Sequence, residues 1–185
     1  MNKKVLLLVL IMVAAVPSLF AADNTVLVAG SPYAKQFVST NVNTEYQSEY
    51  GFGAKLGYRY IDNGVFLGTD VGYQNFKYYN KGSETVAYLQ NLQFLVKMGG
   101  KVRVAERISF NLDIGGGLNV GISRGANNYY NPMVAAGGTI SFRLGNNLAA
   151  VAGLDASLEW AKSKDSVYKS TQVNLVPHLG AEINF

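Results

Sequence analysis

The stretch Ser48–Ile61, SEYGFGAKLGYRYI, decides the fold because large apolar residues alternate in it with small or charged ones. A period of two residues is typical of a β-strand with two different faces, whereas a helix would mix both kinds of residue on each side. The glycines would also weaken a helix. We therefore predict a strand here. Its apolar face consists of Tyr50, Phe52, Ala54, Leu56, Tyr58 and Tyr60.

The same alternation recurs along the rest of the chain. A first strand is expected between Asn24 and Phe37, where Pro32 interrupts the pattern and leaves open which face is apolar. With the stretch quoted above, this makes eight predicted strands. The other six cover Val65–Tyr78, Val86–Val104, Ile108–Ser123, Val134–Leu144, Leu148–Ala161 and Lys169–Phe185.

The connections between these strands alternate in length, which indicates how the strands are joined. Three are tight turns, at 62–64, 105–107 and 145–147, and four are longer polar links, at 39–47, 79–85, 124–132 and 162–168. Short periplasmic turns, longer external loops and an even strand number are typical of outer-membrane barrels. The sequence therefore predicts an all-β fold, a transmembrane up-and-down antiparallel barrel of eight strands.

The N-terminal segment predicts export. Lys3 and Lys4 precede an apolar run from Val5 to Val16, and small residues follow at Ala21 and Ala22. This is the layout of a secretory signal peptide, and the run is shorter than the roughly 20 residues of a spanning helix. We expect residues 1–21 to be a signal peptide, with cleavage after Ala21 or Ala22, and residues 22–185 to form a single barrel domain.

The composition excludes several classes of protein. The chain has no cysteine, so it can form neither a disulfide framework nor a cysteine-based metal site. Without Lys3 and Lys4 the formal net charge falls from +4 to about +2, so the basic balance is partly a feature of the export segment. We infer no nucleic-acid partner from it.

The composition of the two strand faces favours a membrane barrel over a soluble barrel such as a lipocalin. A solvated outer face should be rich in charge. The polar parity, which is the set of alternate residues between the apolar ones, is instead dominated by glycine, alanine, serine and asparagine. Such a face suits the narrow lumen of an eight-stranded barrel. Aromatic residues of the apolar parity gather toward both strand ends, as in the girdles that flank a lipid-facing band. We predict that the apolar parity contacts outer-membrane lipid.

The last strand carries a pattern associated with barrel assembly. Leu179, Ala181 and Ile183 alternate with polar residues and lead to a terminal Phe185. This pattern looks like the C-terminal signature by which the outer-membrane assembly machinery recognises its clients, which makes that machinery an expected partner. With the export segment and the eight-strand layout, the chain resembles the OmpA, OmpX and OmpW class of small barrels. The resemblance implies location in a Gram-negative-type outer membrane.

The polar parity would bring charges of both signs into the lumen. Charges withdrawn from water must pair or form hydrogen bonds, so we predict an ionic network that closes the barrel. The alternative is a narrow water-filled path that carries a small solute, a hydrophobic one included. Lys101 and Arg103 share this parity near the turns. The predicted network consists of Lys55, Arg59, Asp70, Lys97, Asp113, Arg143, Asp155, Glu159, His178 and Glu182.

A lipid-modifying barrel enzyme is a remote alternative. His178 is the only histidine, and its neighbours of the same parity, Val176 and Gly180, provide no nucleophile. One histidine with scattered carboxylates has no metal-ligand spacing, and no phosphate-binding glycine-rich loop is present. We predict no enzymatic activity, no metal and no cofactor.

Two of the long links combine tyrosine with asparagine, at 78–82 and 124–131. These residue types make adaptable contact surfaces, so a host or surface ligand that binds the loops is a candidate partner. The alternative is a hydrophilic loop whose tyrosines rest on the membrane surface. The predicted role of the protein is structural, or is an adhesion-like interaction at the surface.

Overall fold

The computed structural model describes residues 23–40, 45–79, 86–122, 129–162 and 169–185, and the regular elements in these ranges are all strands. No helix in these ranges is long and apolar enough to cross a membrane. The predicted signal peptide and most of the four long links lie outside the described residues. The strands are β1 (Asp23–Thr40), β2 (Glu45–Gln47), β3 (Tyr50–Asp62), β4 (Val65–Tyr79), β5 (Val86–Ala105), β6 (Ile108–Ile122), β7 (Tyr129–Arg143), β8 (Leu148–Lys162) and β9 (Lys169–Asn184).

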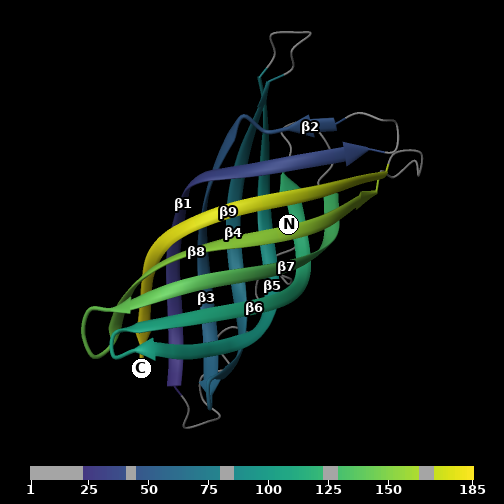
Figure 1. Ribbon diagram of the computed structural model, residues 1–185. Coiled ribbons are helices and arrows are strands. Elements are labelled where there is room, and N and C mark those ends of the chain that lie inside the picture. Colours follow the sequence, from purple (N-terminus) through teal and green to yellow (C-terminus); the bar gives the residue numbers. More distant parts are fainter. Residues whose placement is uncertain (1–22, 41–44, 80–85, 123–128, 163–168) are drawn as a thin grey trace.

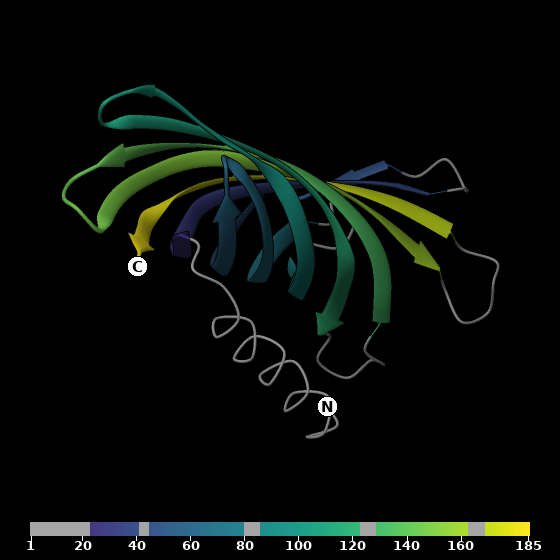
Figure 2. The same cartoon turned by 90° about the horizontal axis from the view of Figure 1, so that it is seen from below.

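Eight of these strands form a closed antiparallel barrel. Apart from the short β2, each strand pairs with the next along the chain, and β9 returns to pair with β1. Strands β1 and β9 lie side by side in both views (Figure 1, Figure 2). The amide of Asn184 donates to the carbonyl of Asn147 (2.9 Å), which holds the C-terminus beside the turn between β7 and β8. The predicted eight-stranded up-and-down barrel is confirmed.

The turn between β3 and β4 shows how local sequence sets the strand register. Asn63 and Gly64 have φ angles of 50° and 80°, in the left-handed region that asparagine and glycine tolerate best. The turn therefore pairs Asp62 directly with Val65. Every later pair of these two strands follows from this register.

The largest departures from the sequence-based prediction lie in two of the predicted links. The short strand β2 lies within the first predicted link and pairs with β1 at Phe37–Ser39. Strand β7 begins at Tyr129, so residues 129–132 of the third predicted link belong to a strand. These residues continue the ladder with β6 as far as the pair Tyr129 and Gly121. Pairing with a neighbouring strand has overridden their loop-like composition.

Pro32 marks an irregularity in β1. The register of β1 shifts around this residue against both β3 and β9, which is a β-bulge. Proline has no N–H to contribute to a ladder, so it is tolerated there. The bulge explains why the parity of this strand could not be read from sequence. The lumen-side residues on the two sides of the bulge are Thr25, Leu27, Ala29, Ser31, Ala34 and Gln36.

The two parities of the strands from β3 to β9 face opposite environments, as predicted. Leu112 on the outer face of β6 is 69% exposed, whereas its neighbours Asn111 and Asp113 are 1% and 5% exposed. An apolar outside around a buried polar interior is the reverse of a soluble protein and is typical of a lipid-facing barrel. The sorting of residues in β3, the strand quoted first, follows the same rule.

Candidate functional site in the barrel lumen

Lys97 of β5 is the centre of a buried ion-pair cluster. Its Nζ lies 3.1 Å from Asp70 Oδ2, 2.9 Å from Asp113 Oδ1 and 3.0 Å from Asp155 Oδ1. The three carboxylates come from β4, β6 and β8, and the lysine side chain is only 2% exposed. One ammonium group therefore links four strands across the middle of the lumen. Gly115 makes room for it, because a Cβ there would lie 2.7 Å from Lys97 Cγ.

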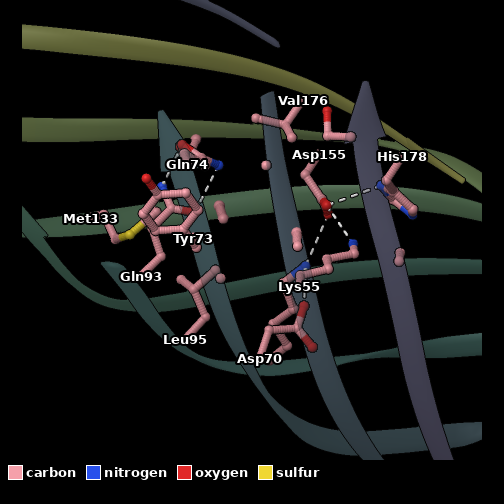
Figure 3. A pocket seen from close by; sticks show the side chains of 18 residues that line it. Lys55, Asp70, Tyr73, Gln74, Gln93, Leu95, Met133, Asp155, Val176 and His178 are labelled. Atoms are coloured by element: carbon pink, nitrogen blue, oxygen red, sulfur yellow. Dashed lines mark hydrogen bonds and ion pairs between the residues drawn. The ribbon is translucent and has the colours of Figure 1, made fainter. Parts of the chain in front are cut away.

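Asp155 joins this cluster to two further basic side chains. Lys55 Nζ lies 2.5 Å and His178 Nδ1 lies 3.2 Å from its Oδ2 atom. Figure 3 shows both side chains turned toward Asp155. The other ring nitrogen of His178, Nε2, lies 3.3 Å from Thr139 Oγ1. Both ring nitrogens of the histidine thus lie close to polar side chains of the lumen.

A second cluster surrounds Glu182 of β9, nearer the turns. Its Oε1 accepts hydrogen bonds from Arg59 Nη1 (3.2 Å) and Asn111 Nδ2 (3.2 Å). Its Oε2 accepts from Ser141 Oγ (2.9 Å) and Lys101 Nζ (3.2 Å). A carboxylate that is 1% exposed is therefore fully surrounded by donors, two of which are charged.

Arg59 connects the two clusters. Its Nη2 lies 3.8 Å from Asp113 Oδ2, and its guanidinium group lies 5.1 Å from the ring centroid of Phe66. The arginine is 1% exposed and the phenylalanine 2% exposed. An ion pair and a cation–π contact thus fill the lumen at the turn end.

Glu159 of β8 is held differently, by amides in place of cations. Its Oε2 accepts from Asn119 Nδ2 (2.5 Å), and its Oε1 accepts from Asn174 Nδ2 (2.5 Å) and Gln93 Nε2 (3.4 Å). Gln93 also exchanges hydrogen bonds with Gln74, at 2.9 and 3.2 Å. We call these five residues the amide layer. No ion pair among the described residues includes Glu159.

A small cavity separates the Lys97 cluster from the amide layer. Its volume is about 40 Å³, and water needs on the order of 10–15 Å³ by this measure, so a few water molecules fit. Figure 3 shows Lys55, Asp155 and His178 on one side of it and Gln74 and Gln93 on the other. The cavity is too small for a solute of metabolite size.

Apolar side chains in the lumen are a feature that the sequence reasoning missed. Phe66 and Phe76 of β4 are buried there, at 2% and 0% exposure. Phe76 packs in a cluster with Ala34 and Val176 near the loop end. Their parity was a usable signal, because both share the parity of Asp70. Only charged side chains and His178 were considered for the lumen, so neither phenylalanine was assigned to a face.

The predicted network residues lie on the lumen side, with one exception. Arg143 is exposed at the end of β7, so the structure does not bring it into the network. Arg103 is exposed as well, and Lys101 contributes the charge beside Glu182. Parity predicts the side of the sheet but not the height in the barrel, and this is why Arg143 was wrongly placed.

The residues of the predicted assembly pattern lie on the outer face of β9. Leu179, Ile183 and Phe185 are 60%, 42% and 65% exposed, and Ala181 is half-buried. The backbone of Phe185 exchanges two hydrogen bonds with Asn24, at 3.0 and 3.2 Å. The last residue is therefore tied to the first barrel strand.

The fold and the filled lumen can now be compared with known proteins. No protein-family profile matches the sequence, and no curated protein matches it significantly. Among solved structures, Neisserial surface protein A is 14% identical with a TM-score of 0.59, and the match covers 88% of this chain and 97% of that one. The outer membrane protein OprG from Pseudomonas aeruginosa is 8% identical with a TM-score of 0.57, covering 89% and 96%.

At these identities the likeness shows the fold alone. The chain has the fold of the small eight-stranded outer-membrane barrels, as the resemblance to that class implied. In the described part of the chain, no group of three or more His, Cys, Asp or Glu side chains is placed to hold a metal ion.

Proposed function

We propose that the protein resides in the outer membrane as a barrel closed to solute flow, and that its role is structural or is an adhesion-like contact at the cell surface. The Lys97 cluster is the observation that carries this proposal. One buried ammonium group binds carboxylates from three other strands in the middle of the lumen. A solute path would require these charges to separate.

Separation of such pairs is unfavourable. Breaking a buried ion pair so that one charge loses its partner costs about 3–5 kcal/mol, which keeps the open form below roughly one molecule in a hundred. Phe66 and Phe76 fill the lumen on the two sides of the cluster and add to the closure. These features favour a plug over the alternative, a narrow path for a small solute.

Solute efflux from vesicles tests the proposal. We expect vesicles that contain the purified protein to release trapped glycine or glucose no faster than protein-free vesicles. A general porin in the same lipid provides the positive control. Efflux that increases with the amount of folded protein would overturn the plug and favour the transport alternative.

The proposed surface role depends on the loops, which are the part of the chain that can contact a ligand outside the membrane. The outer wall is apolar and suits membrane lipid, so a ligand other than lipid would have to bind at the loops. Replacing residues 80–85 and 124–128, the parts of the predicted links between the strands, by Gly-Ser segments of equal length should abolish attachment of expressing cells to a surface while the barrel still folds. Unchanged attachment would limit the role to a structural one.

Export and assembly are also part of the proposal. We expect the mature chain to begin at Ala22 or Asp23, which mass spectrometry of the membrane-inserted protein would establish. Deleting Phe185 should slow insertion by the assembly machinery. No catalytic step is proposed, because His178 is 2% exposed and the cavity beside it is too small to hold a substrate.

A further inference from the structure

The charged side chains of the lumen form two ion-paired clusters, and one carboxylate lies outside both. Four Lys and Arg side chains face four carboxylates in the two clusters. Glu159 is a ninth charge, and no cation among the described residues pairs with it. The paired set comprises Lys55, Arg59, Lys97 and Lys101 with Asp70, Asp113, Asp155 and Glu182.

Glu159 is completely buried, at 0% exposure, in the half of the barrel nearer the loops. An ionised carboxylate in such a place is unfavourable unless it is paired as well as hydrogen-bonded. The amide donors of Asn119, Asn174 and Gln93 supply hydrogen bonds but no formal charge. The layer therefore lacks one positive charge.

Two oxygen acceptors beside this carboxylate also lack a partner. Asn119 Oδ1 and Asn174 Oδ1 form no hydrogen bond within the described structure, although both side chains are 0% exposed. They belong to the same amide groups whose nitrogens bind Glu159, so they lie close to it. Buried acceptors without donors are rare in native proteins and indicate a missing partner.

We propose that the amide layer binds one alkali metal cation, with the Glu159 carboxylate and amide oxygens as its ligands. Carboxylate and carbonyl oxygens suit hard cations. A single positive charge would neutralise the one unpaired carboxylate. A divalent ion would leave an excess charge in the lumen.

Direct binding is the first test, on the folded barrel in detergent with choline chloride as the background salt. Equilibrium dialysis against sodium-22 or rubidium-86, the latter a tracer for potassium, should give close to one bound ion per barrel for one of the two. Glu159→Gln keeps the shape and one accepting oxygen but removes the charge, and it should weaken binding at least tenfold. Glu106→Gln, at an exposed turn position, is the matched control and should bind like the wild type.

Thermal unfolding gives a second readout. At equal ionic strength, the wild type and Glu106→Gln should unfold several degrees higher in the preferred alkali chloride than in choline chloride, and Glu159→Gln should show no difference. Absence of stoichiometric binding by the wild type would overturn the proposal, whether or not Glu159→Gln folds. Stabilisation by acid but not by either ion would also overturn it, because a proton would then neutralise Glu159.

Discussion

The two halves of the lumen are closed by different chemistry. Toward the turns, Lys97 and Glu182 anchor ion pairs in which each group depends on charged partners. Toward the loops, Gln74 and Gln93 bind each other through neutral amides, and Phe76 fills space. Removing one partner of a buried ion pair leaves a charge unpaired, whereas a neutral amide pair can be replaced as a unit. The stability of the barrel should therefore be sensitive to the loss of an ion-paired group and tolerant of replacing the Gln74–Gln93 pair as a unit.

The largest effect is expected for Lys97→Met. The substitution leaves the carboxylates of Asp70, Asp113 and Asp155 near one another without their shared cation. We expect the free energy of unfolding to fall by about 3–5 kcal/mol. Urea titration in lipid vesicles, followed by the fluorescence of Trp160, would measure it.

Val96→Ala is the matched control for this substitution, because Val96 is the sequence neighbour of Lys97 but lies on the outer face with 58% exposure. This substitution should lower the free energy of unfolding by less than about 1 kcal/mol. Equal losses for Lys97→Met and Val96→Ala would contradict the role of Lys97 as the centre of the ionic half.

An intermediate effect on the free energy of unfolding is expected for substitutions in the lipid-facing wall. Leu154 is 49% exposed on the outer face beside Asp155, and Leu112 has the same orientation on β6. Arginine at either position should cost about 2–4 kcal/mol if the residue lies at the bilayer midplane. The same urea titration applies, and unchanged folding of both variants in lipid would refute the assigned facing.

The smallest effect is expected in the amide half. Replacing Gln74 and Gln93 together by methionine removes a pair of mutually satisfied side chains of similar size. The double variant should unfold within about 1 kcal/mol of the wild type, because the two amides satisfy each other and the only other bond lost in the described part of the chain is the long one (3.4 Å) from Gln93 to Glu159. A loss as large as that of Lys97→Met would remove the contrast between the two halves.

The sequence predicted the fold and the facing well because both follow from a period of two. The alternation around Leu56 and Lys55 assigns each side chain to lipid or lumen, and the burial of β3 follows it. Parity contains no information on the tilt of the strands or on their stagger around the barrel. It therefore could not reveal that Lys97 meets three aspartates, or that Arg143 lies beyond the buried zone.

Two further features of the structure were not predicted from the sequence, and each has a local cause. The bulge at Pro32 shifts the register of β1, so a strict alternation could not describe that strand. Phe66 and Phe76 share the inward parity of Asp70, but only charged side chains and His178 were assigned to the lumen from sequence. In a narrow lumen, an aromatic ring fills space that polar side chains leave.

Conductance of the purified barrel in planar lipid bilayers tests the closed lumen most directly. The ion-pair cluster around Lys97 predicts that the wild type gives no steady current above the lipid background, at moderate voltage of either sign. Reproducible open-channel steps from the folded wild-type protein would contradict the account, because they would require a continuous aqueous path through the Lys97 cluster.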